Sequence, residues 1–157
     1  MRTACLPAAI ALAILAGPPS WAGEAECKAV AVAIMQMVKQ PIVRQTDTRS
    51  DFPGPITMIF AQSAMYVSAG GEWKTMDVTA ARRVMEMENL LKMTPLTECR
   101  LDATEDVDGT STLKYDYQWG TEKARIWVGT SDGLPYRVQS GAVLSKMEYA
   151  GVAVPIP

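Results

Sequence analysis

The chain has no histidine among its 157 residues. This absence excludes the Ser–His and Cys–His pairs in which histidine activates a nucleophile, and it excludes a histidine-ligated metal site. Carboxylate neighbours such as Glu105 and Asp106 remain as candidates for acid–base chemistry. Adjacent residues of a strand point to opposite faces, and catalytic acid pairs need a burial that nothing in the sequence indicates. We therefore expect a protein that is not an enzyme.

Positive charge is also scarce. The chain has 15 Lys and Arg against 17 Asp and Glu, which gives a formal net charge of −2. A nucleic-acid-binding domain needs a concentrated basic surface, so we expect no nucleic-acid partner. Beyond the first 22 residues no apolar run is long enough to span a bilayer, so we expect no stable membrane anchor.

Residues 1–22 are typical of a cleaved signal peptide. Arg2 supplies a positive start, residues 6–16 are apolar but too short to cross a bilayer, and Ser20 and Ala22 fit cleavage after Ala22. An uncleaved anchor is the less favoured interpretation. The mature domain is then residues 23–157, and its 157 − 22 = 135 residues suffice for one domain with its own core. We expect secretion to the periplasm or the cell exterior, and favour the periplasm.

Only two cysteines remain after this cleavage, Cys27 and Cys99. An isolated pair in an oxidising compartment is most often a structural disulfide. It would close a loop of about 72 residues, worth roughly 4 kcal/mol on the chain-entropy model. A redox-active pair needs close spacing such as Cys-x-x-Cys, which is absent. We therefore predict a structural disulfide.

The strongest pattern is a meander of three antiparallel strands between Val107 and Val143. Apolar and polar residues alternate over residues 113–119, 123–130 and 134–139, the period of strands with one buried face. Asp108-Gly109 and Ser131-Asp132-Gly133 supply the turns before and within it. The strand expected before the meander spans residues 98–107. Its inward residues are predicted to be Cys99, Leu101, Ala103 and Val107.

Two helices are predicted at residues 26–40 and 79–92, where apolar residues recur at helical spacing and Pro41 and Pro95 follow. The water-facing residues of the second helix are predicted to be Arg82, Arg83, Glu86 and Asn89. Weaker strands are expected at residues 43–48, 56–60, 64–69, 72–75 and 146–149. The fold class is then α+β: a curved antiparallel sheet of seven or eight strands, an incomplete barrel, wrapped over two short helices with an apolar concave side.

Methionine is abundant, and the pairs Met35–Met37 and Met85–Met87 raise the possibility of a Cu(I) site. Residues two apart on a helix diverge by about 200°, so neither pair can share one ion. Core packing, or the lining of a cavity, is the favoured interpretation, and we expect no metal and no cofactor. Trp127 is out of phase with its apolar neighbours and faces solvent, a partner or a loop.

The order of these pieces resembles the LolA/LolB-like and LppX-like half-barrels, the periplasmic lipoprotein-carrier superfamily. The matching segments are a signal peptide and N-terminal helix, a hairpin, a second helix, and short strand motifs. The segments are Met65-Tyr66-Val67, Gly71-Glu72-Trp73-Lys74, Val107-Asp108-Gly109, Tyr115-x-Tyr117, Ile126-Trp127-Val128, Asp132-Gly133-Leu134-Pro135-x-Arg137 and Tyr149 before Pro157. The resemblance implies an incomplete barrel whose concave face, plugged by helices, accepts acyl chains or other apolar ligands.

We therefore expect a periplasmic binding protein for a hydrophobic ligand, namely a lipid, an acyl chain or a lipidated protein. The predicted cavity lining is Met58, Phe60, Tyr66, Leu113, Tyr115, Ile126 and Leu134. The alternative is a periplasmic protein-interaction or structural module with a packed core and no ligand. Its outer face, with Arg125, Trp127 and Arg137, would contact a protein partner.

Overall fold

The structure, a computed structural model, describes residues 22–155. The predicted signal peptide lies outside these residues except for Ala22, which begins the first helix. In chain order the elements are α1 (Ala22–Val38), β1 (Val43–Arg49), β2 (Ile56–Phe60), β3 (Met65–Ala69), β4 (Trp73–Met76), α2 (Ala80–Met93), β5 (Leu96–Val107), β6 (Thr110–Trp119), β7 (Glu122–Gly129), β8 (Pro135–Ser140) and β9 (Val143–Glu148). Neither helix of this range is long and apolar enough to cross a membrane.

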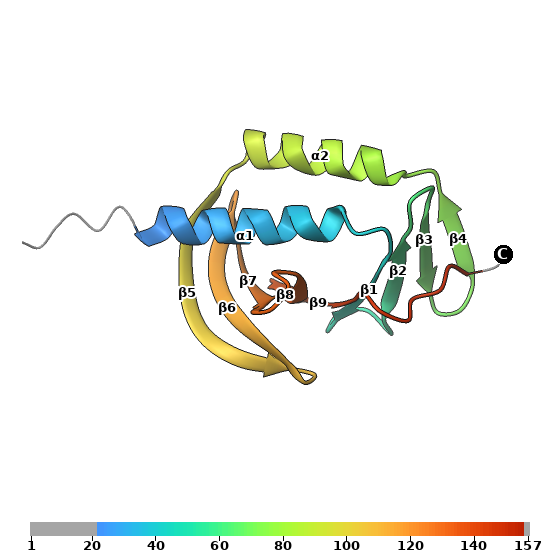
Figure 1. The fold of residues 1–157 in the computed structure, drawn as a ribbon. Coiled ribbons are helices and arrows are strands. Elements are labelled where there is room, and N and C mark those ends of the chain that lie inside the picture. The colour runs from blue at the N-terminus through green and yellow to red at the C-terminus, as the bar shows by residue number, and fades with distance from the viewer. Residues whose placement is uncertain (1–21, 156–157) are drawn as a thin grey trace, which may run out of the picture.

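All strands belong to one antiparallel sheet in the order β4-β3-β2-β1-β9-β8-β7-β6-β5. Pairing of β1 with β9 joins the N-terminal strands to the C-terminal meander. The sheet does not close, because β4 and β5 are its two edges. Helix α2 connects these edges and passes across the open side, as Figure 1 shows. The predicted α+β class and incomplete barrel are confirmed, with nine strands in the described range in place of seven or eight.

Helix α1 fills one half of the curved sheet. Val30, Ala33 and Ile34 recur at three- and four-residue spacing and are buried against β5, β6, β7 and β8. Helix α2 packs mainly on α1. Its N-cap is Thr79, whose Oγ1 accepts a hydrogen bond of 3.3 Å from the Arg82 N–H.

The strand register assigns side chains to two faces. The helix face carries Tyr115, Tyr117 and Ile126, which belong to the core under α1. The far face carries Asp116, Arg125 and Trp127, which alternate with them. These two names are used below for the whole sheet, since directly paired residues share a face.

Two predictions of side-chain orientation are wrong, one for β5 and one for α2. β-Bulges between Thr97 and Arg100 and between Leu101 and Ala103 shift the register of β5. Cys99 is buried, and Leu101 pairs with Tyr115 on the helix face although it is 46% exposed. Ala103, after the second bulge, pairs with Lys114 on the far face. Val107 follows Ala103 at even spacing and is buried on that far face too.

The second error concerns α2. Arg83 was predicted to face water, whereas its side chain points inward and is only 8% exposed. Helical geometry explains this position, because Arg83 lies three residues after Ala80 and four before Met87. Both of those residues are half-buried.

Candidate functional site

Four of the seven predicted ligand-binding residues lie in or near the β6–β8 region. Tyr115 and Ile126 are buried in the core against α1, and Leu113 packs at the edge of that core. Leu134 lies in the β7–β8 turn, where its carbonyl accepts a 2.8 Å hydrogen bond from the Gly129 N–H. In this half of the sheet the helix face is occupied by the protein's own helix.

The other three predicted residues lie in β2 and β3. Ile126 of the helix face pairs with Val138, and Val138 with Ser145, so Met147, two residues on, is on the helix face too. Gln45 pairs with both Met147 and Met58, which places Met58, and Phe60 two residues further, on the same face. Tyr66 pairs with Ile59 and is therefore on the far face. The seven residues do not lie around one common space, and their role in binding stays a prediction.

The helix face of β2, β3 and β4 carries the exposed Lys74, which pairs with Val67, and a separate group of apolar side chains. All of these apolar side chains are half-buried except Met76, which is 46% exposed. We call this group the β2–β4 apolar surface; it consists of Ile56, Met58, Phe60, Met65, Val67 and Met76. The core residues of α1 pack on β5–β8, so this surface lies beyond the part of the sheet that α1 fills. Strand alternation predicted Met58 and Phe60 here, but not the extension across β4.

Arg83 lies at one end of this surface. Its guanidinium carbon is 5.4 Å from the centroid of the Phe60 ring, and its Nη1 donates a 2.7 Å hydrogen bond to the Ala61 carbonyl. Its Nη2 is buried and has no hydrogen-bond partner among residues 22–155. Burial lowers the pKa of Arg83 from its usual value, because desolvation disfavours the charged form.

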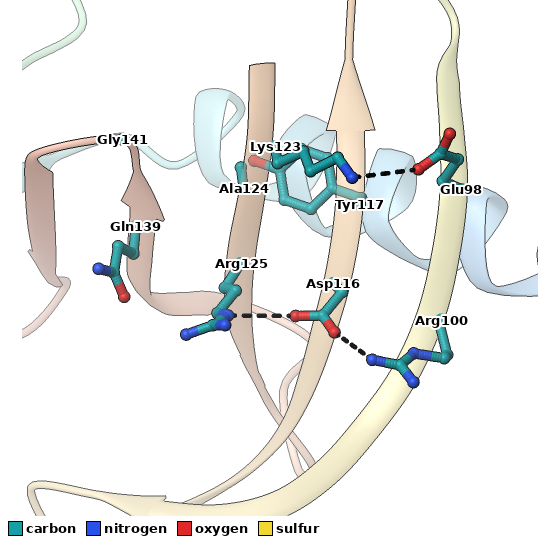
Figure 2. Close-up of a pocket in the computed structure, with 9 residues that line it drawn as sticks. All are labelled: Glu98, Arg100, Asp116, Tyr117, Lys123, Ala124, Arg125, Gln139 and Gly141. Atoms are coloured by element: carbon teal, nitrogen blue, oxygen red, sulfur yellow. Dashed lines mark hydrogen bonds and ion pairs between the residues drawn. The ribbon is translucent and has the colours of Figure 1, made fainter. Parts of the chain in front are cut away.

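The far face has a groove of about 550 Å³ near the bulged start of β5. Figure 2 shows its charged lining: Asp116 bridges Arg100, at 2.7 Å, and Arg125, at 3.2 Å, while Lys123 lies 4.0 Å from Glu98. Glu98 has a φ of 52°, a left-handed conformation that is uncommon outside glycine. The sequence alternation predicts charged residues on this face, but not the bulge that shapes the groove.

Trp127, which the alternative function placed on an outer docking face, is 6% exposed. Arg137 and Lys114 lie over its ring, with the charged atoms 5.5 Å and 5.9 Å from the centroid. The indole is thus covered by cations of the same protein. Of the three residues predicted for docking, Arg125 is the one that lines the groove.

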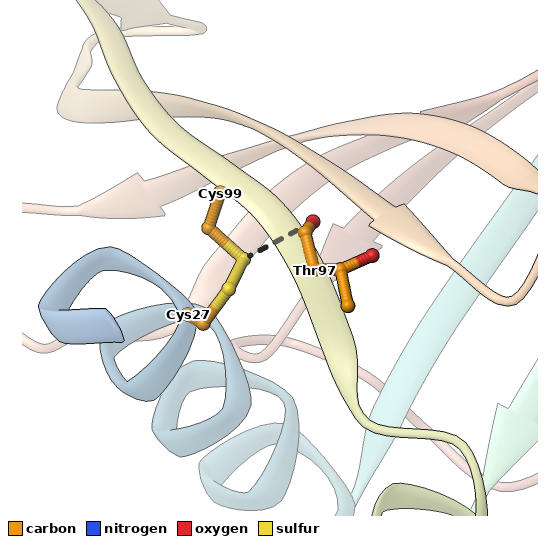
Figure 3. The surroundings of a disulfide bond; sticks show 3 residues. All are labelled: Cys27, Thr97 and Cys99. Atoms are coloured by element: carbon orange, nitrogen blue, oxygen red, sulfur yellow. Dashed lines mark hydrogen bonds between the residues drawn. A yellow bond between two sulfur atoms is a disulfide. The ribbon is translucent and has the colours of Figure 1, made fainter. Parts of the chain in front are cut away.

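The predicted disulfide is present. Cys27 of α1 is bonded to Cys99 of β5, with their Cα atoms 5.0 Å apart. Figure 3 shows the bond between the helix and the strand, with Cys99 Sγ 3.6 Å from the Thr97 carbonyl oxygen. The covalent link therefore holds α1 against the sheet half that it fills.

Comparisons with known proteins show the class of fold: the chain shares the half-barrel fold of the proteins LppX and LprF, a fold that its resemblance predicted. Lipoprotein LppX of Mycobacterium tuberculosis matches with a TM-score of 0.56 and 10% identity, over 84% of this chain and 99% of that one. LprF from Mycobacterium bovis matches with a TM-score of 0.54 and 10% identity, over 87% and 99%. At this identity the likeness shows the fold alone. No protein-family model matches the sequence, and no curated protein does.

Proposed function

We propose that this protein is a non-enzymatic periplasmic binding protein that holds an apolar ligand, such as an acyl chain, on the β2–β4 apolar surface. The observation that carries this proposal is the division of the helix face. Helix α1 fills the β5–β8 half, whereas the apolar side chains over β2–β4 remain partly exposed. Contiguous exposed apolar surface in a monomer typically marks a binding site.

The composition of this surface suits a flexible ligand. Three of its six side chains are methionines, whose unbranched thioethers adapt to different shapes. Each methylene transferred from water to such a surface contributes about 0.8 kcal/mol, so six buried methylenes would contribute roughly 5 kcal/mol. The class of fold also supports the proposal, because the resemblance to LolA-like half-barrels implies acyl-chain binding.

Location in the periplasm is supported by the predicted signal peptide and by the disulfide, which persists in oxidising compartments. A secreted carrier of apolar ligands would shield them from water between membranes. Neither the leader nor the disulfide specifies which ligand is carried.

The test uses residues 23–157 purified from a periplasm. Native mass spectrometry with organic extraction would identify a co-purifying lipid, and calorimetric titration with dodecyl amphiphiles would measure binding. Met76→Glu places a charge on the surface at an exposed position and should weaken binding several-fold. Thr75→Glu is the matched control, because Thr75 is the exposed neighbour on the far face and should leave binding unchanged. Absence of any bound or bindable apolar chain would reject the proposal.

The second candidate function, a protein-interaction module, is favoured by the far-face groove. Its lining carries Arg100, Lys123 and Arg125 against two acids, which suits a partner with an acidic segment. Here Arg125→Glu should abolish capture of a periplasmic partner while Met76→Glu should not. If Met76→Glu abolished capture and Arg125→Glu did not, the β2–β4 apolar surface would be the binding site.

A further inference from the structure

Arg83 lacks the counter-charge that a buried cation requires. Its side chain is more than nine-tenths buried, yet none of the ion pairs among residues 22–155 includes it. The acid one helical turn away, Glu86, is paired at 2.7 Å with Arg82. Buried charges in proteins are normally paired, because desolvation without compensation is costly.

The protein satisfies only part of the hydrogen-bonding capacity of this guanidinium. Nη1 is bonded to the Ala61 carbonyl, a neutral acceptor, and the ring of Phe60 lies against the group. Nη2 is shielded from solvent and donates to no acceptor in the described part of the chain. An arginine fork offers its donors in a geometry that matches two oxygens of a carboxylate or a phosphate.

The position of Arg83 connects its unpaired donor with the proposed ligand. Phe60, Met65 and Met76 are directly paired across β2, β3 and β4, so they form one row of the β2–β4 apolar surface. The guanidinium lies over Phe60, at the start of that row. An apolar tail along the row would bring a head group at its end to Arg83.

We propose that Arg83 binds the anionic head group of an amphiphilic ligand whose tail lies on the β2–β4 apolar surface. The ligand class is a single-chain amphiphile with a carboxylate or phosphate head. This inference rests on the proposed function. Since Nη2 is closed to solvent in this structure, head-group binding requires a small displacement of Arg83 or of the Ala61–Ala64 turn beside it.

The test compares ligands that share a tail. Residues 23–157 are titrated by calorimetry with dodecanoate, dodecyl phosphate, dodecanol and dodecyltrimethylammonium, below their micelle concentrations and at a pH where the acid is ionised. The wild type should bind at least one of the two anions roughly tenfold more tightly than dodecanol, and the cation most weakly. A preference for dodecanoate over dodecyl phosphate, or the reverse, identifies the head group.

Arg83→Met keeps an apolar contact with Phe60 and removes the charge. It should reduce the ratio of anion to alcohol affinity to about one, whereas loosening of α2 alone would weaken both ligands and keep the ratio. Arg83→Lys should retain part of the preference. Arg82→Met is the matched control at the exposed neighbouring position and should leave the ratio unchanged.

The outcomes separate the two proposals. If no dodecyl ligand binds the wild type, the proposed function fails. If the wild type binds dodecanol as tightly as both anions, or Arg83→Met retains the full preference for an anion, only the role of Arg83 fails. Should Arg83→Met not fold, Arg83→Lys still tests the guanidinium: a preference for the anion equal to that of the wild type would contradict the role of Arg83.

Discussion

The indole Nε1 of Trp127 donates a 2.7 Å hydrogen bond to Oε2 of Glu105, so a tryptophan of β7 is joined to a carboxylate of β5 across β6. The other oxygen of Glu105 is 2.8 Å from the ammonium of Lys114, which is also 2.8 Å from Asp102. The β5 bulge makes this arrangement possible, because it turns Glu105 to the far face. What the sequence pattern presents as a charged outer surface is thus a connected polar network around a buried ring.

The network predicts loss of stability in acid. Hydrogen bonds from Lys114 and then from Trp127 lower the pKa of Glu105 below its ordinary value of 4.5, and Lys114 lowers the pKa of Asp102 below 3.8. Carboxyls with lowered folded-state pKa values stabilise the fold fully above their ordinary pKa values, and this contribution is lost as the pH falls through the lowered ones. Glu105→Gln should therefore be less stable than the wild type at neutral pH, and the gap should narrow below about pH 4.

Urea denaturation at neutral pH and at about pH 3 measures this gap. Glu122→Gln, at an exposed position of β7, is the control and should show no comparable change with pH. A gap between the wild type and Glu105→Gln that is equal at both pH values would contradict the predicted role of the Glu105 charge.

Gly129 is predicted to tolerate no side chain. A Cβ there would overlap Oδ1 of Asp132 and lie 2.9 Å from Cε2 of Tyr136. Asp132 cannot easily move, because it accepts hydrogen bonds from the Tyr136 hydroxyl at 2.7 Å and the Leu134 N–H at 3.0 Å. Gly129→Ala should destabilise the fold by about 1–3 kcal/mol.

Thermal and urea unfolding measure this effect. Gly23→Ala is the matched control, since its Cβ would meet only the Cys99 carbonyl oxygen at an ordinary 3.6 Å in a helix that favours alanine. Equal unfolding midpoints for the two variants would show that the β7–β8 turn can shift to accommodate a Cβ at position 129.

The sequence was sufficient for the α+β class and for the C-terminal meander, because the alternation in β6 and β7 is regular and the turn residues are explicit. The helix-face residues Tyr115, Tyr117 and Ile126 are buried as the period of two predicts. The Cys27–Cys99 pairing was predictable because only two cysteines follow the predicted signal peptide. The pairing of β1 with β9 was not predictable, since a contact between residues about a hundred positions apart leaves no local pattern.

The candidate site was predictable only in part. Alternation placed Met58 and Phe60 on one face. The face on which Tyr66 lies depends on the length of the β2–β3 turn, which periodicity does not specify. Whether α1 or a ligand covers Tyr115 and Ile126 depends on how the helix lies across the sheet. Arg83 was readable from its spacing to Ala80 and Met87, and charge alone suggested the wrong side.

The disulfide should contribute much of the stability. Its two half-cystines are 72 residues apart, and on the chain-entropy model closing a loop of that length contributes roughly 4 kcal/mol. The double variant Cys27→Ala/Cys99→Ala should therefore lower the free energy of unfolding by about 2–5 kcal/mol. Urea denaturation of the variant beside reduced and oxidised wild type measures the effect. Identical midpoints for oxidised and reduced protein would show that the bond adds nothing to the fold.

The last prediction concerns alkaline pH. Burial raises the pKa of Tyr117 to about 12, and burial also raises the pKa of Tyr149, whose hydroxyl donates to the Pro135 carbonyl. A phenol whose folded-state pKa is raised stabilises the fold fully below its ordinary pKa of 10, and that contribution is lost as the pH rises toward the folded value. At about pH 11, Tyr117 alone should account for a loss of roughly 1 kcal/mol.

Urea denaturation at about pH 8 and pH 11, with phenolate absorbance followed in parallel, measures this loss. Tyr117→Phe should lose less stability over this interval than the wild type, because it has no phenol to ionise in the unfolded chain. The control Tyr66→Phe removes a half-buried tyrosine on the far face of β3. If Tyr117→Phe loses as much stability as the wild type and as Tyr66→Phe, the Tyr117 phenol does not keep its proton in the folded core.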